Sequence, residues 1–107
     1  MTLPLVIQSY FTADGEGDAD GLCNVFLADA VVSDEQASHR GLAEIRAWWS
    51  AAKRKYGHVA EPLDSAEQSD GTIGVRASVS GQFPGSPVVL DYRFRLSGGK
   101  IAALEIR

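Results

Sequence analysis

The sequence predicts a single α+β domain in which helices cover one face of a β-sheet. Three observations support this class. The chain has 107 residues, a common length for one domain with its own core. Up to Tyr56, apolar residues recur every three or four positions, as in amphipathic helices, whereas from Ile73 onward they alternate with polar residues, as in strands. No repeat, linker or low-complexity segment divides residues 1–107.

The first part of the chain is expected to form a helical hairpin. Its first stripe of apolar residues has helical spacing and comprises Leu3, Val6, Ile7, Tyr10 and Phe11. A second stripe follows the candidate N-cap Asp18 and comprises Leu22, Val25, Phe26 and Asp29. The turn cluster Asp14–Gly17 separates the two helices.

A third helix is predicted over residues 41–56. Gly41 can serve as its N-cap, Glu44 lies in its first turn, Lys53 lies in its last turn, and Gly57 follows. One face of this helix should be buried, because its apolar side chains form a single stripe of Leu42, Ile45, Trp49, Ala52 and Tyr56. Trp48 widens that face.

Alternation of apolar and polar residues predicts the strands. Ile73, Val75, Ala77 and Val79 alternate with polar residues, as do Leu90, Tyr92, Phe94 and Leu96, so half-buried antiparallel strands are expected. Ser97–Gly99 should join the second of these strands to residues 101–107 as a hairpin. A short strand over Ala30–Asp34 is expected between the second and third helices.

Charge and composition exclude several functions. Ten Lys and Arg residues against 14 Asp and Glu residues give a net charge of −4, which offers no basic surface for nucleic acid or an anionic membrane. The apolar runs are too short for a membrane span, and no basic segment introduces a secretory signal, so a cytoplasmic location is expected. Cys23 is a single cysteine, and His39 and His58 lack metal-ligand spacing. We therefore expect neither a metal nor another cofactor.

Several short runs resemble a known family. They are Phe26–Asp34, His39–Gly41, Ile45–Trp49 and Tyr92–Ile101. Together with the element order, they are similar to the SnoaL-like and ketosteroid-isomerase-like branch of the nuclear transport factor 2-like superfamily. The resemblance covers the whole chain. It implies a curved antiparallel sheet wrapped around three N-terminal helices into a cone that encloses a pocket, and it implies no single activity.

The resemblance to ketosteroid isomerases implies three catalytic positions. These enzymes, a worked example of carboxyl-group tuning, hold a carboxylate base opposite a tyrosine and a protonated aspartic acid. An ungapped comparison matches Tyr10 to the tyrosine, Asp34 to the base and Asp91 to the second acid. Strand alternation contradicts the third match, because Asp91 shares its face with Arg93 and not with the apolar residues beside it.

The remaining pocket candidates are mostly aromatic or aliphatic. We expect the pocket wall to include Trp49, Val32, Phe26, Tyr92, Phe94, Leu104 and His39. Each has a simpler interpretation: Tyr10 and Trp49 as core aromatic residues, Asp34 as an exposed carboxylate at a turn, and His39 as a partly exposed hairpin histidine. Cys23 and His58 are interpreted as ordinary structural residues.

Two functions remain open from the sequence. The first is a cofactor-independent isomerase or related proton-transfer enzyme acting on a small apolar carbonyl compound, with Asp34 as base and Tyr10 as hydrogen-bond donor. The second is a noncatalytic module that binds a small apolar molecule or dimerises through its sheet. In either case a homodimer formed through the outer sheet face is expected.

Overall fold

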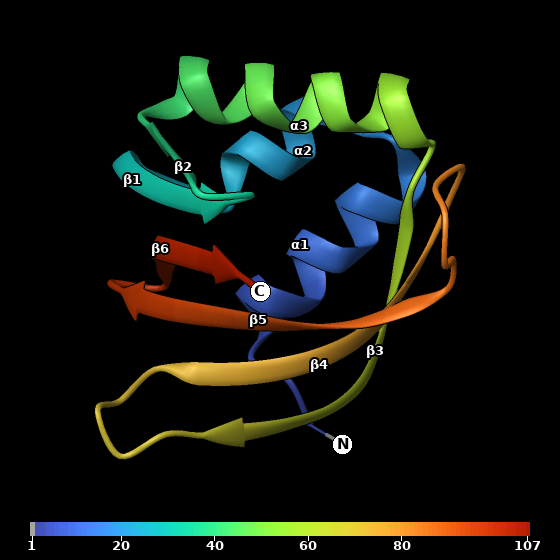
Figure 1. Ribbon diagram of the computed structural model, residues 1–107. Helices are drawn as coiled ribbons and strands as arrows, with labels where there is room; N and C mark the ends of the chain where they lie inside the picture. The colour runs from blue at the N-terminus through green and yellow to red at the C-terminus, as the bar shows by residue number, and fades with distance from the viewer. Residues whose placement is uncertain (1) are drawn as a thin grey trace.

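The computed structural model describes residues 2–107, which form three helices and one curved, six-stranded sheet. The helices are α1 (Leu5–Glu16), α2 (Ala19–Asn24) and α3 (Leu42–Tyr56). The strands are β1 (Phe26–Asp34), β2 (Ala37–Arg40), β3 (Val59–Glu67), β4 (Ile73–Ser80), β5 (Val88–Ser97) and β6 (Lys100–Ile106). The predicted α+β class and cone-like arrangement are confirmed: the sheet bends around α1, and α3 lies across the end formed by β1 and β2 (Figure 1).

The sheet is mixed rather than wholly antiparallel. Its strand order is β2-β1-β6-β5-β4-β3, and β1 runs parallel to β6 while every other neighbouring pair is antiparallel. Parallel pairing needs a long connection, and β1 and β6 are separated in the chain by β2, α3, β3, β4 and β5. The sheet does not close on itself, since β2 and β3 remain edge strands.

The helix ends follow the predicted signals. Asp18 caps α2 by accepting a hydrogen bond from the backbone N–H of Gly21 at 3.0 Å. Gly57 ends α3 in the left-handed conformation at φ 57°, where a residue without a Cβ has little strain. Within α3, Ile45 and Trp49 are fully buried, so the predicted apolar face is confirmed.

Two predicted segments need correction. The second helix ends at Asn24, and Phe26 to Asp29 belong to β1, because pairing with β6 satisfies this backbone: Phe26 lies opposite Ile101. Strands β2 and β3 were not predicted. Strand β3 is an edge strand that contains Pro62 and mostly exposed residues, so it carries no alternating pattern, and its register with β4 shifts between Pro62 and Asp64.

The alternation of β4 and β5 correctly separates the two faces of the sheet. Val75, Tyr92 and Phe94 are buried in the core, whereas Arg76 and Arg93 are exposed on the outer face. The predicted hairpin between β5 and β6 is also confirmed, with Gly98 and Gly99 both at positive φ. Within residues 2–107, no helix is both long enough and apolar enough to cross a membrane. The cytoplasmic location stays a prediction.

Candidate functional site

A cavity of about 450 Å³ lies on the concave side of the sheet, between the strands and helix α3. Aromatic and aliphatic side chains form most of its wall, and a few titratable groups interrupt them. The aromatic residues are Tyr10, Trp48, Tyr56, Phe83 and Tyr92, and the titratable side chains besides the tyrosines are Asp34, Glu35, His39, Lys55 and His58. A largely apolar cavity with a few polar groups is the usual form of a small-molecule site.

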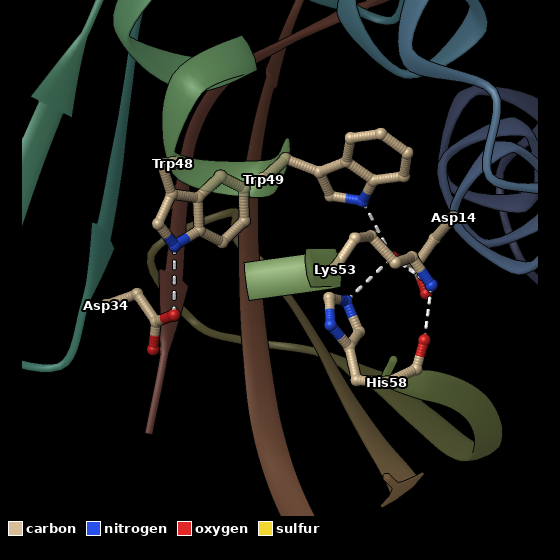
Figure 2. Close-up of polar contacts among 6 residues, drawn as sticks. All are labelled: Asp14, Asp34, Trp48, Trp49, Lys53 and His58. Atoms are coloured by element: carbon tan, nitrogen blue, oxygen red, sulfur yellow. Dashed lines mark hydrogen bonds and ion pairs between the residues drawn. The ribbon is translucent and has the colours of Figure 1, made fainter. Parts of the chain in front are cut away.

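Asp34 lies at the cavity because it is the last residue of β1. The β1–β2 hairpin turns immediately after it, with Glu35 and Gln36 in the left-handed region at φ 52° and 64°. The indole Nε1 of Trp48 donates a hydrogen bond to Oδ2 of Asp34 at 3.0 Å (Figure 2). Burial raises the pKa of Asp34 above its usual value, and the hydrogen bond from Trp48 offsets only part of that effect. The carboxyl group therefore accepts a proton more readily than an exposed aspartate does.

Tyr10 and Tyr92 are two of the aromatic residues that line the cavity. Tyr10 is only 2% exposed, and its ring makes edge contacts with Phe94 at 5.5 Å and Tyr92 at 6.3 Å between ring centroids. Burial raises the pKa of Tyr10 well above its usual value, with the nearby charge of Asp14 adding to the effect. The phenol of Tyr10 is therefore protonated at neutral pH and can donate a hydrogen bond.

A second carboxylate, which the sequence did not single out, lies in the last part of α1. Asp14 is 1% exposed, and its Oδ1 accepts hydrogen bonds from Nε1 of Trp49 at 2.8 Å and from Nε2 of His58 at 3.0 Å (Figure 2). Nζ of Lys53 lies 3.5 Å from the same oxygen. The other oxygen, Oδ2, is buried and has no hydrogen-bond partner among residues 2–107.

The surroundings of Asp14 keep it ionised. Burial acts to raise its pKa, but the hydrogen bonds from His58 and Trp49 and the charges of His58 and Lys53 together outweigh burial. The pKa of Asp14 consequently lies below its usual value. The sequence placed Asp14 in a turn cluster and treated His58 as structural. Helical spacing could have indicated this site. Asp14 follows Tyr10 by four residues, and Lys53 follows Trp49 by four, so each pair lies on one face of its helix.

The other predicted site residues divide into two groups. His39 and Tyr92 line the cavity as expected. The remaining five candidates are at most 4% exposed and pack in the core without lining the cavity: Trp49, Val32, Phe26, Phe94 and Leu104. The structure places these five residues in the core and not on this cavity wall, because a buried position in a strand or a helix does not distinguish a core residue from one beside a cavity.

Asp91 does not join the cavity. It is exposed on the outer face of β5, opposite Arg76 of β4 and beside Arg93. The strand-alternation argument was therefore correct. The ungapped match to the isomerase acid was wrong, because it requires Asp91 to lie on the opposite face of the sheet. Among residues 2–107, no three His, Cys, Asp or Glu side chains gather in an arrangement that could hold a metal ion.

The fold agrees with the family comparison. Residues 7–104 match the SnoaL-like domain, and the chain belongs to that family. The fold is the nuclear transport factor 2-like, ketosteroid-isomerase-like fold that the resemblance in the sequence implied, and solved structures share it. A search of curated proteins found no match.

Solved structures include one close relative. A protein of Sinorhizobium meliloti, named as a candidate polyketide cyclase, is 50% identical, with a TM-score of 0.94 over 98% of this chain and 95% of that chain. A Catenulispora acidiphila protein with a ketosteroid-isomerase-like fold, solved with trimethylamine, is 18% identical with a TM-score of 0.85, over 99% and 86% of the two chains. An epoxide hydrolase/cyclase-like enzyme of pyran-ring formation in salinomycin is 20% identical with a TM-score of 0.77, over 95% and 86%. The last two share the fold alone.

Proposed function

We propose that the protein catalyses cofactor-independent proton transfer on a small apolar carbonyl compound, as an isomerase or a cyclase does. The observation that carries this proposal is that Asp34 and Tyr10 line one largely apolar cavity. The SnoaL-like family and the relative named as a candidate polyketide cyclase support the same class of chemistry. A cavity of about 450 Å³ suits a substrate of the size of one or a few rings.

In this proposal Asp34 is the base and Tyr10 stabilises the enolate. Asp34, ionised, takes a proton from the carbon next to the substrate carbonyl, and its raised pKa makes it a stronger acceptor than an exposed carboxylate. The electron pair of the broken C–H bond forms the enolate double bond, and negative charge develops on the carbonyl oxygen. The protonated phenol of Tyr10 donates a hydrogen bond to that oxygen.

Solvent-proton exchange tests this proposal without knowledge of the natural substrate. The protein is incubated in deuterium oxide with cyclohexanone and with a β,γ-unsaturated ketosteroid, and deuterium at the carbon next to the carbonyl is followed by mass spectrometry. Asp34→Asn should lower the exchange rate by about 100-fold or more. Tyr10→Phe should lower the maximal rate more than the affinity. Asp20→Asn, an exposed aspartate of α2, is the matched control and should leave the rate unchanged.

A noncatalytic binding module is the second candidate. The position of Asp91 on the outer face favours it, because the acid that completes the isomerase arrangement is missing from the cavity at that position. In that case small cyclic ketones bind, and parent and Asp34→Asn protein bind them alike without catalysing exchange. Calorimetric titration of the two proteins together with the exchange measurement separates the two functions.

We also propose that two chains pair through the outer sheet face. That face carries both charges in alternation, including Arg76, Asp91 and Arg93, together with Val89, which is 53% exposed. Such a mixed surface can pair with itself about a twofold axis. Sedimentation at micromolar concentration should give twice the mass of the 11.4 kDa chain, and Val89→Arg should give a monomer. A parent protein that sediments at 11.4 kDa contradicts the pairing.

A further inference from the structure

Asp14 is a buried charge that the function proposed above does not use. An ionised carboxylate with 1% exposure costs folding free energy unless donors surround it. Here the donors of Trp49 and His58 converge on Oδ1, with Lys53 nearby, while Oδ2 remains buried without a partner among residues 2–107. The arrangement around Asp14 fixes one neighbour, His58, at one end of its ring.

His58 connects this buried carboxylate to the cavity. It follows Gly57 at the end of α3, it is one of the residues that line the cavity, and its Nε2 lies 3.0 Å from Oδ1 of Asp14. An ionised carboxylate can only accept hydrogen bonds, so Nε2 of His58 carries a proton whether the imidazole is neutral or charged. The proton that His58 gains or loses is therefore the one on Nδ1. The backbone carbonyl of His58 also accepts a hydrogen bond from Lys53, which holds the residue in place.

We propose that Asp14 and His58 form a second acid–base centre of the cavity, with Asp14 as the positioning residue and His58 as the catalytic residue that transfers a proton through Nδ1. This inference rests on the function proposed above and extends it. Asp34 takes the proton from carbon, and the Nδ1–H of an imidazolium His58 gives its proton to the developing oxygen anion. The C–H electron pair becomes the C=C bond, the oxygen becomes a hydroxyl group, and each side chain recovers its original state by the reverse transfer.

Variants of His58 and Asp14 test the proposal in the exchange experiment. His58→Gln should lower kcat by about 100-fold or more, with KM little changed, because a general acid is removed. Asp14→Asn should lower kcat less. The double variant Asp14→Asn/His58→Gln should be no slower than His58→Gln alone, because Asp14 acts through His58. Parent-like turnover of His58→Gln, with Asp34→Asn inactive, overturns the second centre and leaves the proposed function intact. A double variant slowed by the product of the two single effects overturns the positioning role.

A spectroscopic measurement tests the pairing of Asp14 with His58 even if the protein exchanges no proton of any ketone. Long-range proton–nitrogen spectra of the parent protein should place the ring proton of His58 on Nε2, with His39 as the internal reference. Titration with 4-nitrophenol, whose hydroxyl group can donate to an acceptor in the cavity, should shift the Nδ1 resonance of His58, and Asp14→Asn should weaken that shift. A proton on Nδ1, or an Nδ1 resonance unmoved by bound phenol, overturns the proposal. Absence of exchange with every ketone contradicts the proposed function alone.

Discussion

Two neighbouring tryptophans of α3 bind two aspartates, and the two aspartates have opposite electrostatic character. Adjacent helical residues point about 100° apart, so Trp48 meets Asp34 at the cavity while Trp49 meets Asp14 between α1 and α3 (Figure 2). Each indole donates one hydrogen bond, at 3.0 Å and 2.8 Å. Yet the pKa of Asp34 is raised and that of Asp14 is lowered.

The difference lies in what else surrounds each carboxylate. Asp14 is the more deeply buried of the two, but His58 and Lys53 add a hydrogen bond and positive charge. Asp34 is only half-buried, and the negative charge of Glu35, which raises its pKa, acts more strongly than the charge of His39, which lowers it. Burial alone therefore does not set the protonation state. Two carboxyl groups whose pKa values are pushed apart are the usual arrangement for separate proton-transfer roles.

The largest expected effect is on stability at Trp49. Trp49→Ala removes a buried aromatic side chain and a donor to buried Asp14, and it should destabilise the fold by about 3–5 kcal/mol. Trp48→Ala should cost clearly less, because Trp48 is only half-buried and Asp34 can turn toward water. Urea unfolding followed by circular dichroism measures both. Equal costs for the two variants contradict the contrast between core and cavity wall.

The next largest effect is the change in stability at neutral pH when each of the two carboxylates is replaced. Asp14→Asn should destabilise the fold by about 1–3 kcal/mol, because it leaves the donors of His58 and Lys53 without their charged partner. Asp34→Asn should be neutral or stabilising, because it removes a charge that burial disfavours. Thermal unfolding of the two variants beside Asp20→Asn provides the comparison. A stabilising Asp14→Asn would show that the buried anion does not hold α1 against α3.

The two stability differences should change with pH in opposite senses. The folded pKa of Asp14 is below its unfolded value of about 3.9, so its contribution is complete above that pH and disappears as the pH falls through the folded pKa. The folded pKa of Asp34 is above its unfolded value, so its ionisation penalty is complete above the folded pKa and is gone below about pH 3.9. Urea unfolding of parent, Asp14→Asn and Asp34→Asn between neutral pH and acid measures both trends. A destabilisation by Asp14→Asn that persists unchanged in acid contradicts the lowered pKa.

The smallest expected effect is on the pKa of Asp34 when the indole of Trp48 is replaced. Trp48→Phe keeps an aromatic ring but removes the donor to Asp34, so the pKa of Asp34 should rise further, since that hydrogen bond lowers it. Carbon-13 titration of the Asp34 carboxyl group measures the shift. Asp14 should titrate as in the parent, which makes it the internal control. An unchanged titration of Asp34 means that the hydrogen bond from Trp48 contributes little in solution.

Much of the fold was predictable from local chemistry. The capping residue Asp18, the stripe that contains Ile45 and Trp49, and the alternation around Tyr92 each produce their structure from nearby residues, and each prediction is confirmed. The short runs in β1 and α3 also sufficed to indicate the family. Strand β3 escaped prediction because its backbone is ordered by pairing with β4, and its exposed edge residues need no alternation.

The sequence by itself determined the α+β class and indicated the family, and it singled out Tyr10 and Asp34 as candidates for one cavity. Hydrophobic periodicity and short motifs indicate which side chains become buried. Both are local patterns, because they depend on residues that are neighbours in the chain. Only the tertiary structure decided between the two conflicting placements of Asp91, put Trp49 in the core, and brought Asp14 to His58. Asp14 and His58 are 44 residues apart in sequence. Their contact depends on how α1 packs against β3, which His58 directly precedes, and this long-range arrangement is encoded by no local pattern.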